Sequence, residues 1–211
     1  MAIRAQVHPV YSPLITISGL GNDPKLLADD AAIFTSVNGV AHGPEGHGRS
    51  AYCVGSATTK AARDRGWRAD LRGETADELV TDLVKTPPSE RLVHLSGVHT
   101  RGNICARLNE YGMQAQNFAV YDQKAQNLSE EARKVLARRY PVIAPLFSPR
   151  TSAQFAREVP RSMHVHAIVF SNAVAQNLDQ ASYATVTVSS APNFGAMLTA
   201  LATVLSDLPA G

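Results

Sequence analysis

The sequence has few cysteines, little net charge and no long apolar run. Of its 211 residues two are cysteines, Cys53 and Cys105, without metal-type spacing, so we expect buried, reduced thiols. A net charge of +2 gives no bulk attraction for DNA or RNA. No apolar run approaches the roughly 20 residues that span a bilayer, and Met1 to His8 is too short and polar for a signal peptide. These absences predict a cytoplasmic protein without a nucleic-acid or membrane partner.

Nucleotide-binding and metal-binding motifs are also incomplete. Gly19-Leu20-Gly21 lacks the third glycine of a dinucleotide fingerprint. Gly97 and Gly102 have phosphate-loop spacing, but the lysine that should follow them is missing. His164 and His166 alternate along a predicted strand, yet no carboxylate or cysteine lies beside them. We therefore expect no nucleotide and no metal site, and interpret the two histidines as polar residues at the start of a strand.

What the sequence does contain is a regular alternation of apolar strands and amphipathic helices. Strands are predicted at 32–36, 51–54, 67–71, 92–95, 118–122, 142–147, 165–170 and 185–188. Helices are predicted at 56–66, 75–86 and 101–111 and from about 129, 149, 172 and 192 onward, with a turn and a glycine-rich loop at 37–50. Strands that alternate with helices are typical of parallel sheets covered on both faces, so the fold class is α/β.

Small hydroxyl-bearing residues and glycines follow five of the predicted strands. The pairs are Thr35-Ser36, Gly55-Ser56, Ser96-Gly97, Ser148-Pro149 and Ser171-Asn172. Backbone N–H groups at a helix start attract anions, so five such turns indicate an anionic, oxygen-rich ligand. The same residue types are favoured helix caps, and for any single turn capping alone is the simpler interpretation.

Tyr121 ends the strand that lies near the middle of the chain. Open α/β sheets present functional groups at this end of their strands, which makes the phenol a candidate catalytic group. The alternative is an aromatic side chain half-buried in packing. Arg101, Arg150 and Arg161 are candidates for meeting carboxylates, or are surface charges.

Taken in order, these segments resemble the uroporphyrinogen-III synthase family. The resemblance runs from about Pro9 to the C-terminus. Its marks are Ile33 to Ser36 with Asn38-Gly39, Val54 to Thr58 with Gly66, Gly73 with the helix from Ala76, His94 to Gly97 with Arg101 and Gly112, Val120-Tyr121, and Leu146 to Pro149. It implies two α/β domains, each a parallel sheet flanked by helices, joined by a two-stranded linker. Residues 1–16 and 121–211 would form the first domain and residues 17–120 the inserted second one.

The resemblance also implies a reaction. The substrate would be hydroxymethylbilane, a linear tetrapyrrole rich in carboxylates, which is closed to uroporphyrinogen III with inversion of ring D and loss of water. No cofactor or metal takes part in that family. Tyr121 would face the cleft and assist departure of the hydroxyl group. The residues expected to contact substrate are Thr35, Ser36, Gly55, Thr58, Ser96, Gly97, Arg101, Ser148, Ser171 and Asn172.

Three features depart from the family pattern. The chain lacks the usual first strand and helix before the Pro9 segment, Ser171 to Val174 replaces a threonine-containing turn, and Pro145 interrupts a strand expected to be internal. The family resemblance predicts a monomer, whereas an uncovered sheet would favour a dimer if Met1 is the genuine start. The alternative function is a non-catalytic binder of an anionic metabolite, or an inactive truncated relative of the synthases.

Overall fold

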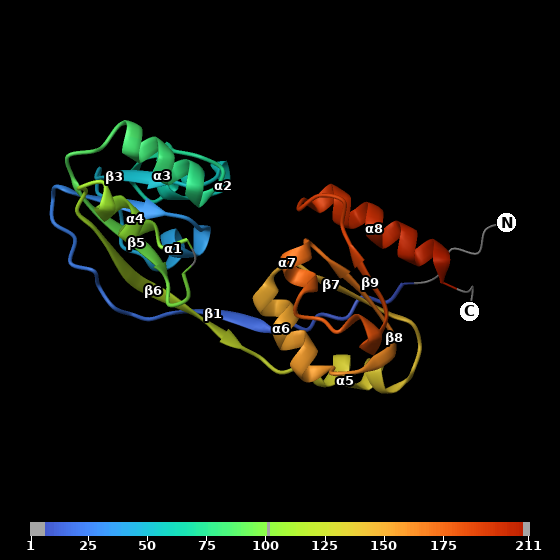
Figure 1. Ribbon diagram of the computed structural model, residues 1–211. Helices are drawn as coiled ribbons and strands as arrows, with labels where there is room; N and C mark the ends of the chain where they lie inside the picture. The colour runs from blue at the N-terminus through green and yellow to red at the C-terminus, as the bar shows by residue number, and fades with distance from the viewer. Residues whose placement is uncertain (1–6, 101, 209–211) are drawn as a thin grey trace. The chain divides into compact units, whose positions relative to one another are not determined.

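The computed structural model describes residues 7–100 and 102–208, which form two compact units (Figure 1). Unit 1 consists of residues 1–16 together with 125–211, and unit 2 of Ile17–Lys124. The chain therefore starts in unit 1, builds unit 2 and returns. The return lies at Lys124, beyond the residue 120 expected from the sequence, because one strand continues from Ala115 to Ala125. Within the described ranges no helix is long and apolar enough to cross a membrane.

Unit 2 is organised around a six-stranded sheet in the order β1-β6-β5-β2-β3-β4. The strands are β1 (Ile15–Gly19), β2 (Asp30–Phe34), β3 (Ser50–Cys53), β4 (Arg68–Leu71), β5 (Arg91–Gly97) and β6 (Ala115–Ala125). All neighbouring pairs from β6 to β4 are parallel, with Ala32 of β2 opposite Ala51 on one side and Val93 on the other. β2 is buried along its whole length, which makes it the centre of the unit.

Helices cover both faces of this sheet (Figure 1). α1 (Val37–His42) and α2 (Ser56–Asp64) pack on one face, where Val40 and Ala62 join a core built around Phe34 and Trp67. α3 (Ala76–Lys85) and α4 (Ile104–Glu110) cover the other face, where the core contains the residues Ile33, Leu79, Leu83, Leu92 and Leu108. Thr75 caps α3, since its Oγ1 accepts from the Glu78 N–H at 3.2 Å, and the Glu78 side chain accepts from the Glu74 N–H at 2.7 Å.

α1 lies where the sequence predicted a turn and a loop. Its six residues are held at the start by Ser36, whose Oγ accepts a hydrogen bond from the Asn38 N–H at 3.1 Å. Gly39 lets the helix lie directly on β5, because a Cβ added there would be 2.4 Å from the Leu95 carbonyl oxygen. A helix of six residues, less than two turns, is too short to show periodicity, and its stability comes from this packing.

Unit 1 contains a parallel three-stranded sheet in the order β7-β8-β9. The strands are β7 (Val142–Leu146), β8 (Ser162–Val169) and β9 (Tyr183–Val188). The helices are α5 (Glu130–Ala137), α6 (Pro149–Glu158), α7 (Asn172–Ala175), the 3-10 turn η1 (Gln180–Ser182) and α8 (Phe194–Asp207). Phe155 of α6 and Val174 of α7 belong to one core, whereas Met197 and Val204 of α8 pack against Ile168 in another. The alternation of strands and helices is thus confirmed, with the α/β class.

Pro145 lies on β7, which pairs only with β8 within the described residues. Its register partner is Ile168, and the proline is exposed. Edge strands tolerate proline because one side of the strand needs no N–H donor. The expectation that Pro145 interrupts an internal strand is therefore wrong for the described part of the chain.

β1 and β6 form the pair of strands that enters and leaves unit 2. The Leu20 N–H donates to the Val120 carbonyl at 3.0 Å, and the Gln126 N–H donates to the Leu14 carbonyl at 2.8 Å. Residue numbers rise along one strand as they fall along the other, so the two strands run antiparallel. Leu14, just before β1, is buried in the core of unit 1.

Asp30 anchors the amino end of β2. It is 3% exposed, and its two carboxylate oxygens accept from Arg91 Nε at 2.8 Å and Arg91 Nη2 at 2.6 Å. The Leu27 N–H donates to Asp30 Oδ2 at 2.7 Å. The hydrogen bond from Arg91 holds the pKa of Asp30 below its ordinary value, although burial opposes this shift. A buried carboxylate paired in two places is expected to stabilise the sheet.

The variant Asp30→Asn should lower the free energy of unfolding by about 2 kcal/mol near neutral pH. Because the pKa of Asp30 is lower in the folded than in the unfolded chain, the stabilisation is present above the unfolded value of about 3.9 and is lost as the pH falls through the folded value. Urea unfolding of both proteins at about pH 7 and about pH 2.5 measures this. Asp64→Asn, at the exposed pair with Lys60, is the control and should change little. An equal loss at both pH values would contradict the role of the ionised carboxylate.

Candidate functional site

The predicted site residues of unit 2 lie along one edge of its sheet. The strands β6, β5, β2 and β3 are consecutive neighbours and parallel, so their carboxyl ends meet at that edge. Ser96-Gly97, Thr35-Ser36 and Gly55 lie at the ends of β5, β2 and β3, and Tyr121 lies opposite Gly97 on β6, which continues to Ala125. In unit 1, Ser148 and Ser171-Asn172 follow β7 and β8 at the corresponding edge of the other sheet. The structure thus groups the predicted residues by unit.

A β-bulge in β6 aims the side chain of Tyr121. Ser96 of β5 is opposite Ala119, but Gly97 is opposite Tyr121, so Val120 is an extra residue in β6. The bulge places Val120 and Tyr121 in the same core cluster, although consecutive residues of a regular strand point to opposite faces. Two hydrogen bonds fix this backbone: Val98 N–H to the Tyr121 carbonyl at 2.9 Å, and Leu20 N–H to the Val120 carbonyl at 3.0 Å.

The ring of Tyr121 lies directly on Gly97. A Cβ added at Gly97 would be 2.8 Å from Cε2, 2.9 Å from Cζ and 3.2 Å from the hydroxyl oxygen of Tyr121. The ring of His42, at the end of α1, lies 6.0 Å away between centroids. Tyr121 is 6% exposed, so most of its ring is packed, yet its hydroxyl has no hydrogen-bond partner within the described ranges. That hydroxyl is therefore free to donate to a ligand.

The hydroxyl groups at two of the strand-end turns serve as helix caps. Ser36 Oγ caps α1, and Ser148 Oγ caps α6 by accepting from the Thr151 N–H at 3.1 Å. Gly55 and Ser171 begin α2 and α7 without a side-chain cap. Gly55 has φ +78°, a left-handed conformation that suits glycine. The first N–H groups of α2 and α7 are thus left without a side-chain acceptor, which suits an anion.

A buried polar cluster lies behind the ends of β2, β5 and β6. Thr35 Oγ1 is 3.1 Å from His94 Nε2, and Ser96 Oγ is 2.9 Å from Asn117 Oδ1 and 3.0 Å from the Gly97 carbonyl. His94 and Ser96 are each 3% exposed. Burial lowers the pKa of His94 to about 4, although a hydrogen bond with Asn117 opposes the shift. His94 is therefore neutral at physiological pH, and Ser96 faces the protein interior.

Comparison with known protein families identifies the family of this chain. The family model described as uroporphyrinogen-III synthase HemD matches residues 2–199. The chain belongs to the uroporphyrinogen-III synthase family. Members of this family are lyases that close a tetrapyrrole ring, as the sequence resemblance predicted. None of the curated proteins matches this chain.

Two solved structures resemble this member of the synthase family. The uroporphyrinogen-III synthetase of Helicobacter pylori 26695 shares 18% identity over 90% of this chain and 91% of its own, with a TM-score of 0.68. A mutant uroporphyrinogen III synthase of the extremely thermophilic bacterium Thermus thermophilus shares 12% identity over 93% and 88%, with a TM-score of 0.50. At these identities the likeness shows the two-domain α/β fold, which confirms the fold class expected from the sequence.

Sequence reasoning missed two histidines beside the candidate site. His42 lies on α1, which was predicted as a loop, and His94 was treated only as part of a strand. The alternation of His94 and Ser96 with Val93 and Leu95 is a signal of two polar residues on one face of a buried strand. Of the remaining predicted contacts, Thr58 is 6% exposed and Asn172 is exposed, and Arg101 lies outside the described residues.

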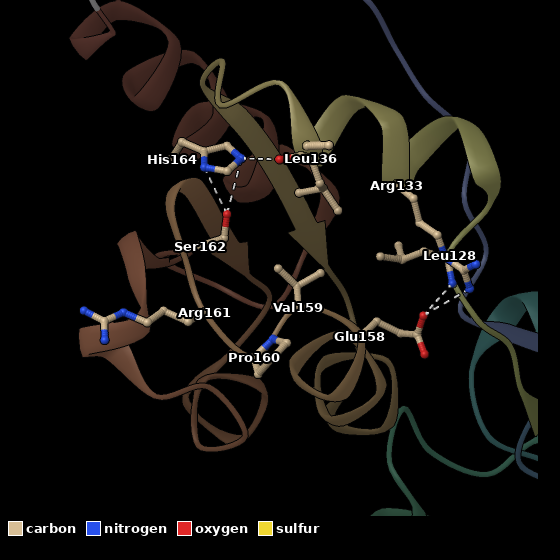
Figure 2. A pocket seen from close by; sticks show the side chains of 10 residues that line it. Leu128, Arg133, Leu136, Glu158, Val159, Pro160, Arg161, Ser162 and His164 are labelled. Carbon is tan, nitrogen blue, oxygen red and sulfur yellow. Dashed lines mark hydrogen bonds and ion pairs between the residues drawn. The ribbon is translucent and has the colours of Figure 1, made fainter.

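A hollow of about 330 Å³ in unit 1 lies at the amino end of β8, away from the strand-end turns (Figure 2). Figure 2 shows that His164, Ser162, Arg133 and Glu158 are bonded within the protein, whereas no interaction is drawn for Arg161. His164 Nε2 is 2.8 Å from the Leu136 carbonyl, Ser162 Oγ is 3.1 Å from His164 Nδ1, and Arg133 is 3.7 Å from Glu158. Because His164, Ser162, Arg133 and Glu158 already have partners within the protein, we assign the hollow no ligand.

The side chains of His164 and His166 contact different partners and do not converge on one metal position. His166 Nδ1 is 3.1 Å from Thr185 Oγ1 on β9, whereas His164 bonds to Leu136 and Ser162. Within the described ranges no group of three or more histidine, cysteine, aspartate or glutamate side chains is placed to hold a metal ion. The interpretation of the pair as polar strand residues thus agrees with their contacts. Cys53 and Cys105 are free thiols that form no disulfide bond with each other; the first is buried and the second half-buried.

Proposed function

We propose that this protein closes hydroxymethylbilane to uroporphyrinogen III with inversion of ring D and loss of water. Membership of the synthase family over residues 2–199 supports the reaction. The structural observation that carries the proposal is the placement of Tyr121, because the bulge at Val120 holds its ring on Gly97 and leaves its hydroxyl unpaired within the described residues. A free phenol at the carboxyl edge of a parallel sheet suits a proton donor.

Tyr121 is proposed to assist departure of the substrate hydroxyl. The bond between carbon and the hydroxyl oxygen breaks while the phenol gives its proton to that oxygen, which leaves as water. The phenolate regains a proton from the pyrrole system, which loses one when the ring closes. The pyrrole nitrogen supplies electrons to the carbon left behind, so the protein needs to do little covalent chemistry. Its main task is then to hold a flexible chain in the geometry that closes on the substituted carbon.

The strand-end turns are proposed to bind the carboxylates. The Ser36 and Ser148 hydroxyls accept from helix N–H groups, so each can still donate its own O–H, alongside the backbone N–H groups of those turns that remain uncapped. Gly55 with Thr58 in unit 2 and Ser171-Asn172 in unit 1 offer N–H groups that no side chain caps. We also propose Arg101 as a carboxylate partner. Ser96 is then a support within the protein, since its hydroxyl faces Asn117.

The sequence and the family also suggest the setting in which the enzyme works. We propose a monomer in the cytoplasm that acts on a tetrapyrrole without a metal or cofactor. Support comes from the family match, from the small net charge of +2 and from strand-end turns that supply donors from the chain itself. Light scattering at working concentration measures the mass, and a dimer would contradict the proposed monomer.

Product analysis tests the proposed reaction. Purified protein is incubated with freshly generated hydroxymethylbilane, the products are oxidised, and isomers III and I are separated. We expect an excess of isomer III, whereas heat-denatured protein should give the isomer I that forms spontaneously. Isomer I alone from the native protein would contradict the synthase reaction and favour a binder of an anionic metabolite.

A further inference from the structure

His94 occupies a position where a buried strand normally carries an apolar residue. It lies on β5 opposite Ile33 of β2 and Asn117 of β6, and it follows Leu92 on the face covered by α3 and α4. The side chain is 3% exposed. An imidazole at such a site must lose its hydration, which is costly unless its polar atoms find partners. The partner of its Nε2 is the hydroxyl of Thr35 at 3.1 Å.

This contact fixes the hydroxyl group of Thr35. A threonine hydroxyl can donate one hydrogen bond and accept others, and without a partner it rotates. The neutral His94 ring occupies one of these positions from the interior side. Thr35 itself is half-buried and directly follows β2, so its hydroxyl keeps a second hydrogen-bonding position that a ligand at the strand ends could use. The hydrogen bond with His94 on the interior side therefore sets the orientation of the Thr35 hydroxyl.

We propose that His94 is a positioning residue for substrate binding, because it fixes the Thr35 hydroxyl toward the bound tetrapyrrole. This inference rests on the proposed function, in which Thr35 contacts substrate. His94 itself touches no substrate and acts only through Thr35. Pre-orientation of a hydroxyl lowers the entropy lost on binding. Loss of that orientation should therefore raise KM and leave kcat nearly unchanged.

The test compares steady-state kinetics of isomer III formation in single and double variants. His94→Phe retains an aromatic ring of similar size but removes Nε2, and Thr35→Val removes the hydroxyl. Each variant should raise KM by about 3-fold to 10-fold and change kcat by less than about 2-fold, the size of one lost hydrogen bond. His94→Gln keeps a side-chain amide near the position of Nε2 and should restore part of the affinity.

The double variant separates positioning from a merely structural role. If His94 acts through Thr35, adding His94→Phe to Thr35→Val should raise KM no further. A full additional increase would overturn the proposal. The matched control is His166→Phe in unit 1, since His166 contacts Thr185 at the same distance of 3.1 Å across neighbouring strands. It should leave KM unchanged.

A readout independent of turnover completes the test. Nitrogen NMR of the histidine rings in the wild-type protein should show His94 neutral at pH 7, and Thr35→Val should shift its Nε2 resonance. An unchanged resonance would overturn the proposed contact. If the wild-type protein makes no isomer III, the proposed function fails whatever the NMR result. If isomer III forms but Thr35→Val leaves KM unchanged, only the present inference fails.

Discussion

Replacement of Tyr121 by phenylalanine is expected to lower kcat for isomer III formation by about 100-fold, the lower end of the range for general acid–base catalysis. The phenol is the group proposed to stabilise the departing hydroxyl, so its contribution appears in the transition state and not in substrate binding. KM should therefore change little. The ring packing on Gly97 is retained in phenylalanine, so the fold should also be retained. Stopped assays with isomer separation give both constants.

Tyr140→Phe is the matched control for this prediction. Tyr140 is 69% exposed in unit 1, and loss of its hydroxyl should change neither kcat nor the melting temperature. The melting temperature of Tyr121→Phe should stay within a few degrees of the wild-type value, which shows that lost activity does not reflect unfolding. Unchanged turnover in a folded Tyr121→Phe protein would remove Tyr121 from the mechanism.

Alanine at Gly39 is expected to lower the free energy of unfolding by about 3 kcal/mol. The added Cβ would lie 2.4 Å from the Leu95 carbonyl oxygen, which is backbone of the buried strand β5 and cannot move aside as a flexible side chain would. α1 must then lift from the sheet, and His42 with it. Urea unfolding measures the loss, and the midpoint should fall without a change in slope.

Gly195→Ala supplies the control for this substitution. Gly195 also lies in a helix, α8, but the nearest atom to an added Cβ is Asn193 Oδ1 at an ordinary 3.5 Å. Alanine favours a helix over glycine by up to about 1 kcal/mol, so stability should be unchanged or slightly raised. Equal destabilisation by the two substitutions would show that close packing of Gly39 on β5 is not the cause.

The sequence allowed prediction of most elements because the signals that form them are local. A helix was expected from about residue 129, and Ser129 caps α5, since its Oγ accepts from the Ala132 N–H at 3.2 Å. Alternation of apolar strands with helices predicted parallel sheets, which the structure has. Tyr121 was expected to end its strand, which is wrong, because β6 continues beyond it to Ala125. Each of these predictions depends on residues a few positions apart, where periodicity and capping preferences apply.

The features that could not be predicted depend on residues far apart in the chain. The bulge at Val120 arises from the register between β5 and β6, which no local pattern in β6 reveals. The pairing of Thr35 with His94 spans 59 positions. α1 exists because Gly39 fits against Leu95, a contact made across two strands of the sheet. Sequence periodicity identifies a strand, but only the assembled sheet decides which of its side chains meet.

The path of the chain through β1 and β6 has a consequence for folding during synthesis. Unit 2 is one uninterrupted stretch, so its sheet can form as soon as Lys124 has left the ribosome. Unit 1 is not, since Leu14 belongs to the same core as Leu128 and Ala132. The side chain of Leu14 therefore stays exposed until unit 2 and the segment with Leu128 and Ala132 have been synthesised. Of the two units, unit 2 can therefore fold first during synthesis.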